Sequence, residues 1–287
     1  MGTGWHEWPL IIFTVLAQCV VGAFIVMALV LAEGKQANQV AHTARLRMFF
    51  LWVLLGVAFV ASVMHLGSPA RAFNALNRMG ASPLSNEIAC GSLFFALGGV
   101  YWLLAVCNTL PPALSKCWLL VTSLTGIGFL YAMARVYHIT TVPTWDPVYT
   151  SLSFTLTALI GGPFLGYLLL RSAGAAARGS VRWLPLVSLL ALIISCAAWL
   201  CQVAGLNSIQ SSVQSASSLV PALGALLGGR LALIALGLGC WITPLLTHKT
   251  PGVLALVSGF TLVVGGELIG RGIFYGLHMT VGLTYGG

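Results

Sequence analysis

The chain has 287 residues, of which 59% are hydrophobic and only 6% are charged. A soluble domain needs about 25% charged residues to cover its surface, so this composition excludes a water-soluble globular protein. The net charge of +8 does not indicate nucleic-acid binding, because the basic residues lie at the ends of apolar segments and in short loops instead of on one soluble face.

Eight apolar segments are long enough to cross a bilayer, which takes roughly 20 residues each. They cover residues 9–32, 48–66, 87–108, 117–138, 149–170, 183–204, 226–247 and 252–277. The sequence therefore predicts an all-α integral membrane protein, with residues 1–287 as a single polytopic domain. The Ala-, Gly- and Arg-rich stretch "RSAGAAARGSVR", residues 171–182, is the most linker-like. It separates two candidate halves, 1–170 and 183–287, which we interpret as two four-helix bundles.

The first apolar segment has no Lys or Arg ahead of it in "MGTGWHEWPL", so it lacks the basic region of a cleaved secretory signal. We interpret it as a retained span. The seven cysteines fall within or at the ends of spans and form no CxxC motif. We expect them to be small packing residues, and we expect no iron–sulfur or zinc ligation by this protein.

An even number of spans places both termini on one side of the membrane, together with the loops near 67–86, 139–148 and 205–225. Eight of the thirteen Lys and Arg residues fall on the opposite side: Lys35, Arg45, Arg47, Lys116, Arg171, Arg178, Arg182 and Lys249. Because cytoplasmic loops carry an excess of Lys and Arg, this asymmetry predicts that the termini lie outside the cytoplasm.

The loop after the second span, "GSPARAFNALNRMGASPLSNE", predicts a short surface helix. Ser68 and Pro69 suit its start and Gly80 suits its end. On such a helix three polar side chains share one face: Arg71, Asn74 and Arg78. This face either anchors the helix to lipid headgroups or docks a partner protein.

The loop at 206–223, "LNSIQSSVQSASSLVPAL", has no charge and is rich in Ser and Gln. It favours a second surface helix, with Ile209, Val213 and Leu219 turned inward. An outer loop without charge is poorly suited to full exposure to solvent, so we expect a partner protein to cover this loop.

The last span carries four polar groups in "GELIGRGIFYGLHMTVG", residues 266–282. Glu267, Arg271 and Tyr275 follow one another at i+4, and His278 comes three residues later, so all four fall within a stripe about 80 degrees wide. Glu267 and Arg271 are spaced to pair along the helix, which lowers the cost of burying both. The stripe is either a structural pair with an interfacial Tyr and His, or the wall of a polar pocket.

His65 ends the second span in "VMHLGSP", and Glu87 begins the third in "SNEIACGS". A lone histidine at a helix end is often only interfacial. Here, however, both residues are expected at the same outer depth as the polar stripe, and an imidazole and a carboxylate are suitable groups for taking protons from a hydroquinone. Haem is not expected, because no histidine lies in the middle of a span to serve as an axial ligand.

Three stretches carry a resemblance to a known family: "GWHEWPL" at the start, "HLGSPARAFNALNRMGASPLSNEIA" after the second span, and "GELIGRGIFYGLHMTVG" at the end. Together they resemble the membrane anchor subunit, or C subunit, of bacterial anaerobic dimethyl sulfoxide reductase complexes. The likeness extends over the whole sequence and is strongest in these stretches, all of which map to the outer side.

The resemblance implies an eight-span subunit of the bacterial inner membrane without its own prosthetic group. It would anchor an iron–sulfur subunit and a molybdopterin catalytic subunit, and would oxidise menaquinol to supply their electrons. The family's quinol-associated His and Glu match His65 and Glu87. From their spacing we expect Arg271, Tyr275 and His278 to line the same quinol pocket, with Arg271 or Tyr275 holding a quinone oxygen.

Paralogues share these motifs, so the terminal acceptor stays open. Two other functions also stay open: a purely structural anchor, and a transporter, for which Gly161, Gly162 and Pro163 interrupt the fifth span.

Overall fold

The computed structural model describes residues 3–65, 77–175, 179–206, 208–209 and 215–280. Eight helices in this part of the protein are long and apolar enough to cross a membrane, which confirms the predicted spans. They contain α1 (Trp8–Glu33), α3 (Phe49–His65), which reaches span length together with α2 (Asn38–Arg47) before it, α4 (Pro83–Val106), α5 (Pro112–Val136), α6 (Pro147–Ser172), α7 (Leu184–Leu206), α8 (Leu223–Leu246) and α9 (Val253–Gly276).

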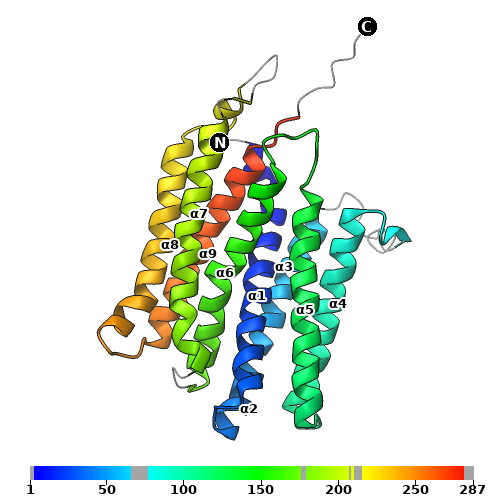
Figure 1. Ribbon diagram of the computed structural model, residues 1–287, viewed down its shortest axis with the longest axis vertical. Coiled ribbons are helices and arrows are strands. Elements are labelled where there is room, and N and C mark those ends of the chain that lie inside the picture. The colour runs from blue at the N-terminus through cyan, green and yellow to red at the C-terminus, as the bar shows by residue number, and fades with distance from the viewer. Residues whose placement is uncertain (1–2, 66–76, 176–178, 207, 210–214, 281–287) are drawn as a thin grey trace.

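Two helices, α1 and α6, form the centre of the bundle. In their most apolar windows 72% and 78% of the residues are buried, against 28% to 39% for the other six helices. In Figure 1, α3, α4 and α5 lie on one side of this central pair and α7, α8 and α9 on the other. Five of the eight described spans begin before the linker 171–182 and three follow it, so the interpretation as two four-helix bundles is wrong. The halves 1–170 and 183–287 stay a prediction.

The central helices approach closely because glycines face each other at their crossing. A Cβ atom at Gly162 would lie 2.5 Å from Cα of Gly22, so neither position has room for a side chain. Helix α6 also continues through Pro163 without a break. The Gly161-Gly162-Pro163 stretch that interrupts the apolar pattern is therefore part of a continuous packed helix.

Local sequence explains where several helices begin. Proline occupies the first turn of α1, α4, α5 and α6, where its missing N–H costs no hydrogen bond. At α6 the Asp146 carboxylate also accepts hydrogen bonds from the backbone N–H groups of Val148 and Tyr149.

One helix was not expected from the sequence. Helix α2 (Asn38–Arg47) is short and polar, and precedes α3 at the end of the molecule that lacks the termini (Figure 1). A search for apolar segments of span length does not predict it as a separate helix, because it is short and polar. We call this end the opposite end, and the end with Gly4 and His278 the terminal end.

The first predicted surface helix falls largely outside the described residues, whereas most of the second loop is described and holds no helix longer than three residues there. Residues 66–76, with Arg71 and Asn74, are not among the described residues, and Arg78 is exposed. In the second loop the described part holds the short 3-10 helix η4 (Ala216–Ser218), while Ile209 and Leu219 pack against a buried apolar cluster. Two further 3-10 helices, η1 (Thr3–Glu7) and η3 (Gly179–Trp183), precede α1 and α7.

Candidate functional site

A cavity of about 360 Å³ opens at the terminal end, where segments far apart in the sequence meet. Its lining comes from η1, α1, α3, the α5–α6 connection and α9: Glu7, Leu10, His65, Tyr137, Ile139, Trp145, Tyr275 and His278. We call it the His65 cavity. Three residues singled out in the sequence, His65, Tyr275 and His278, therefore line one space.

His65 is paired with an acidic residue from the start of the sequence. Its Nδ1 atom lies 3.1 Å from Oε2 of Glu7, and both side chains are partly exposed. At this distance the Glu7 carboxylate and a protonated imidazole form an ion pair. His65 is thus placed so that the charge it gains on accepting a proton is paired.

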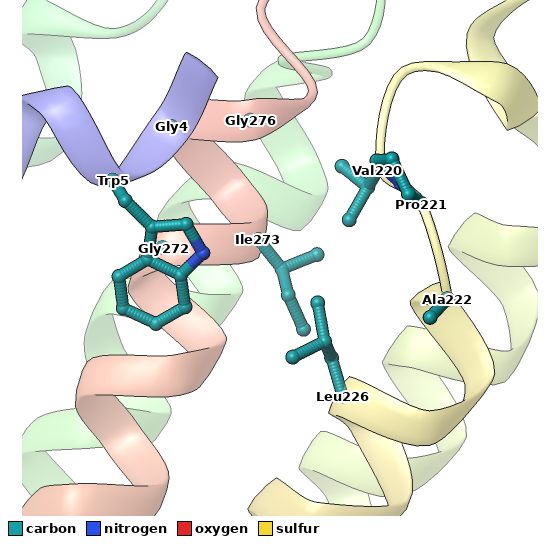
Figure 2. A pocket seen from close by; sticks show the side chains of 9 residues that line it. All are labelled: Gly4, Trp5, Val220, Pro221, Ala222, Leu226, Gly272, Ile273 and Gly276. Atoms are coloured by element: carbon teal, nitrogen blue, oxygen red, sulfur yellow. The ribbon is translucent and has the colours of Figure 1, made fainter. Parts of the chain in front are cut away.

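Glycines explain how Glu7 reaches His65. A Cβ atom at Gly4 would collide with the backbone of Gly272 and Gly276, so only glycine lets η1 cross α9 this closely. Figure 2 shows η1 crossing α9 at Gly276, with the indole of Trp5 beside Gly272. Gly272 and Gly276, two of the three glycines in "GRGIFYG", therefore fix the segment that presents Glu7.

A second cavity, of about 500 Å³, lies beside this crossing and is drawn in Figure 2. Its lining contains no ionisable side chain, and Ile273 and Leu226 contribute to it from α9 and α8. It offers an apolar surface and no group that could exchange protons.

Two tyrosine hydroxyl groups in the wall of the His65 cavity are hydrogen-bonded to each other. The hydroxyl oxygens of Tyr137 and Tyr275 lie 2.6 Å apart, so one hydroxyl donates to the other. Burial raises the pKa of Tyr137 well above its ordinary value, and Tyr275 and Glu87 raise it further while Arg271 opposes them. Tyr137 therefore keeps its proton and is available as a hydrogen-bond donor.

The aromatic side of the cavity is held by Trp145. Its indole N–H donates a 2.8 Å hydrogen bond to the carbonyl of Phe274, and its ring centroid lies 4.8 Å from that of His278. His278 itself is exposed and follows the end of α9 at Gly276, so the predicted helical stripe stops short of it. His278 therefore reaches the cavity wall from the segment that follows α9, and not from the helix itself.

The predicted direct pairing of Glu267 with Arg271 is corrected by the structure. Thr157 lies between them: its hydroxyl donates to Oε2 of Glu267 at 2.7 Å and accepts from Nη2 of Arg271 at 3.4 Å. The ion pair of Glu267 is with Arg230 on α8, at 3.2 Å, and Arg271 donates to Gln18 on α1 at 2.9 Å.

Packing explains this exchange of partners. Residues at i+4 share a helix face, but this face is buried against three other helices that supply hydrogen-bonding groups of their own. Glu267, Arg271 and Arg230 are all buried, and a buried charge costs several kcal/mol unless it is paired. Arg271 also stacks on the ring of Phe154, with its guanidinium carbon 3.7 Å from the centroid. The network ties α1, α6, α8 and α9 together behind the cavity.

Glu87 lines a neighbouring cavity of about 170 Å³ instead of the His65 cavity. This space is mostly apolar, with Phe13, Phe59 and Phe129 in its wall. Glu87 is buried, and its Oε1 atom has no hydrogen-bond partner among the described residues. An unsatisfied carboxyl oxygen in an apolar setting is costly, so the position is one where a bound polar group would be favourable.

Sequence reasoning missed several residues of the cavity. Glu7 lies inside the "GWHEWPL" stretch that carries the family resemblance, so a signal was present for it. Tyr137 and Trp145 come from the connection around α5 and α6, where no sequence pattern indicated that they would meet α9. Within the described residues, no group of three or more His, Cys, Asp or Glu side chains could hold a metal ion.

Comparison with known proteins places these features in a family. A model of the DMSO reductase anchor subunit (DmsC) matches residues 1–277. The sequence is 54% identical over 285 residues to the C subunit of anaerobic dimethyl sulfoxide reductase from Escherichia coli (strain K12), covering 99% of each protein. It is 53% identical to the YnfH subunit of the same organism, over the full length of both proteins. Against the C subunit from Haemophilus influenzae (strain ATCC 51907 / DSM 11121 / KW20 / Rd) it is 44% identical, again over both full lengths. With the motifs and the eight spans, these matches show that the protein belongs to the DMSO reductase anchor subunit family.

Proposed function

We propose that this protein anchors a reductase complex in the bacterial inner membrane and oxidises menaquinol in the His65 cavity. The electrons pass to an iron–sulfur subunit and then to a molybdopterin catalytic subunit, in a heterotrimer. The observation that carries the proposal is the meeting of His65, paired with Glu7, and the Tyr137–Tyr275 pair around one cavity at the membrane edge.

The chemistry requires two proton acceptors, because a quinol that becomes a quinone loses two electrons and two protons. His65 takes one proton, and the Glu7 carboxylate stabilises the imidazolium that forms. Tyr275, held by Tyr137, hydrogen-bonds the opposite oxygen of the ring. We propose Glu87 as the acceptor of the second proton: it lies close enough to Tyr137 to raise the pKa of that hydroxyl, although it lines a separate cavity.

The role that we propose for Arg271 differs from the direct quinol contact expected from the sequence. It lies behind Tyr275, bonded to Gln18 and Thr157, and does not line the His65 cavity. Its positive charge favours the build-up of negative charge on the ring oxygen as the quinol is deprotonated. We assign Arg271 and Glu267 to positioning α9, and not to direct contact with quinol.

Electron transfer requires the iron–sulfur partner to bind close to the His65 cavity. The electrons must leave to an iron–sulfur cluster held close over the terminal end, where Arg78 is exposed. Arg71 and Asn74, expected from the sequence to dock the same partner, lie outside the described residues. With the termini in the periplasm, as the distribution of Lys and Arg favours, protons are released and electrons consumed on the same side. Turnover then moves no net charge across the membrane.

The test separates quinol oxidation from the chemistry of the partners. His65→Phe should lower menaquinol-driven reductase activity of the membrane-bound complex by at least about 100-fold, the usual contribution of general acid–base groups. Reduction driven by an artificial dye that feeds electrons to the partners should be unchanged. Quinol-driven turnover at the normal rate in this variant would refute the site, and would favour a purely structural anchor. A transporter predicts solute flux without the partner subunits.

A further inference from the structure

The opposite end of the molecule holds a polar cavity that the proposed function does not use. It has a volume of about 330 Å³ and lies between the end of α1, helix α2, the end of α4 and the start of α5. Its polar lining is Gln36, Asn38, Arg45, Asn108, Ser115 and Lys116. We call it the Arg45 cavity.

Two cations in this lining have no acidic counterpart. Of the five acidic residues in the sequence, only Glu33 falls at this end, and it pairs with Lys35 at 3.2 Å. Across the described ranges no ion pair joins Arg45 or Lys116 to a carboxylate. The Nε atom of Arg45 is buried and has no hydrogen-bond partner there. A buried guanidinium N–H and a nearby ammonium group together fit an anion.

Two helix starts add to the positive potential. Helix α2 begins at Asn38 and α5 at Pro112, both of which line the cavity. Their N-cap residues are Ala37 and Pro111, and neither start has a side-chain cap. Helix starts carry unsatisfied N–H groups and a partial positive charge, although at α5 the prolines at 111 and 112 have no N–H to donate.

The end of α4 also reaches this cavity, and its carbonyl groups would repel an anion. Three of them, however, already accept hydrogen bonds from the residues that follow: those of Leu103, Leu104 and Ala105, from the amides of Cys107, Thr109 and Asn108. The negative end of α4 is thus largely satisfied. Helix α1 also ends at this cavity, next to Gly34, so Arg45 and Lys116 offset the carboxyl end of α1 as well.

We propose that the Arg45 cavity binds the phosphate group of an anionic phospholipid. A lipid fits better than free phosphate because the cavity lies where α4 ends and α5 begins and because Leu31, Leu110 and Leu119 form an apolar part of its lining. On α5 the side chains of Leu114 and Leu120 are exposed beside it, where they would face acyl chains. Basic pockets between spans suit such headgroups.

Native mass spectrometry of the assembled, detergent-purified complex tests the proposal, with phosphatidylglycerol as the probe. The wild type should retain one phosphatidylglycerol that the double variant Arg45→Gln/Lys116→Gln binds at least about tenfold more weakly. The matched control, Arg182→Gln/Lys249→Gln, removes the same charge from exposed positions at the same end and should retain the lipid. The charge-conserving variant Arg45→Lys/Lys116→Arg should bind it as well.

Equal retention by the cavity variant and the control would overturn the site. Phosphatidylcholine and inorganic phosphate serve as competitors, and neither should displace the bound lipid. Displacement by inorganic phosphate would mean that the cavity takes a free anion, which would contradict the assignment to a lipid. If the double variant failed to assemble, Lys116→Gln alone, at an exposed residue, should still weaken binding, and unchanged binding would refute the proposal.

Discussion

Glu7 and His65 lie 3.1 Å apart at the terminal end, although one precedes the first span and the other ends the second transmembrane helix. The contact depends on η1, which packs on α9 through Gly4, Gly272 and Gly276. The start, the second span and the last span thus cooperate in one site, and these are the three regions whose motifs resemble the family.

Replacing Glu7 tests the value of this pair. Glu7→Gln preserves the side-chain shape but removes the charge that stabilises protonated His65, so quinol-driven kcat should fall by about tenfold. His6→Gln, at an exposed neighbouring position, should leave kcat unchanged. Steady-state kinetics with a water-soluble menaquinol analogue would measure both, and equal kcat values in the two variants would contradict the role of Glu7.

Tyr137 is a residue that sequence patterns did not indicate. Tyr137→Phe removes the hydroxyl that lies 2.6 Å from Tyr275 and leaves the aromatic packing in place. A lost hydrogen bond of this kind costs about 1 kcal/mol, so KM for quinol should rise roughly fivefold, with dye-driven activity unchanged. Tyr101→Phe, which loses a buried hydroxyl pair with Ser115 away from the His65 cavity, is the control. A KM equal to the wild-type value would show that the tyrosine pair does not hold substrate.

The glycine crossing should be sensitive to a single methyl group. Gly4→Ala would force η1 away from the backbone of α9, a distortion that costs about 1–3 kcal/mol, and it should lower quinol-driven activity by moving Glu7. Gly56→Ala on α3 meets open space and should be tolerated. Thermal unfolding and quinol kinetics of both variants would check this, and full activity of Gly4→Ala would show that the crossing does not position the site.

The buried charge network should matter for stability before it matters for catalysis. Glu267→Gln leaves Arg230 buried without its carboxylate, which should destabilise the protein by about 3–5 kcal/mol. Lys35→Gln breaks an ion pair at a well-exposed side chain and should cost no more than about 1 kcal/mol. Thermal unfolding of the purified complexes compares them, and similar melting temperatures would contradict the structural role of Glu267.

His138 should make stability depend on pH. Burial and the charge of Arg135 lower the pKa of His138 despite the opposing Asp146, so the folded state binds its proton less readily than the unfolded state. Stability is therefore lost as the pH falls through about 6.5, where the unfolded state gains its proton first. His138→Gln should show a smaller drop in melting temperature between pH 7.5 and pH 5.5. An equal drop in both proteins would assign the pH dependence to other groups.

The fold was largely predictable from the sequence, because each span is a long apolar segment whose length the bilayer dictates. Helix α2 was missed because it is polar and short, and a search for long apolar segments does not detect such helices. Within the site, His65, Tyr275 and His278 were found because ionisable groups are rare in spans. The partners of Glu267 and Arg271 could not be predicted, because they come from other helices: Thr157, Gln18 and Arg230. The spacing of residues along α9 carries no information about side chains on other helices.

Quinol binding in the His65 cavity can be measured by a fluorescence titration. A fluorescent quinol analogue should be quenched at one saturable site per complex in wild-type membranes, and the binding should be lost in His65→Phe membranes that hold equal amounts of the assembled complex. Arg78→Gln, exposed outside the cavity, should bind as the wild type does. Saturable binding of unchanged affinity in the His65→Phe membranes would contradict a quinol site in this cavity.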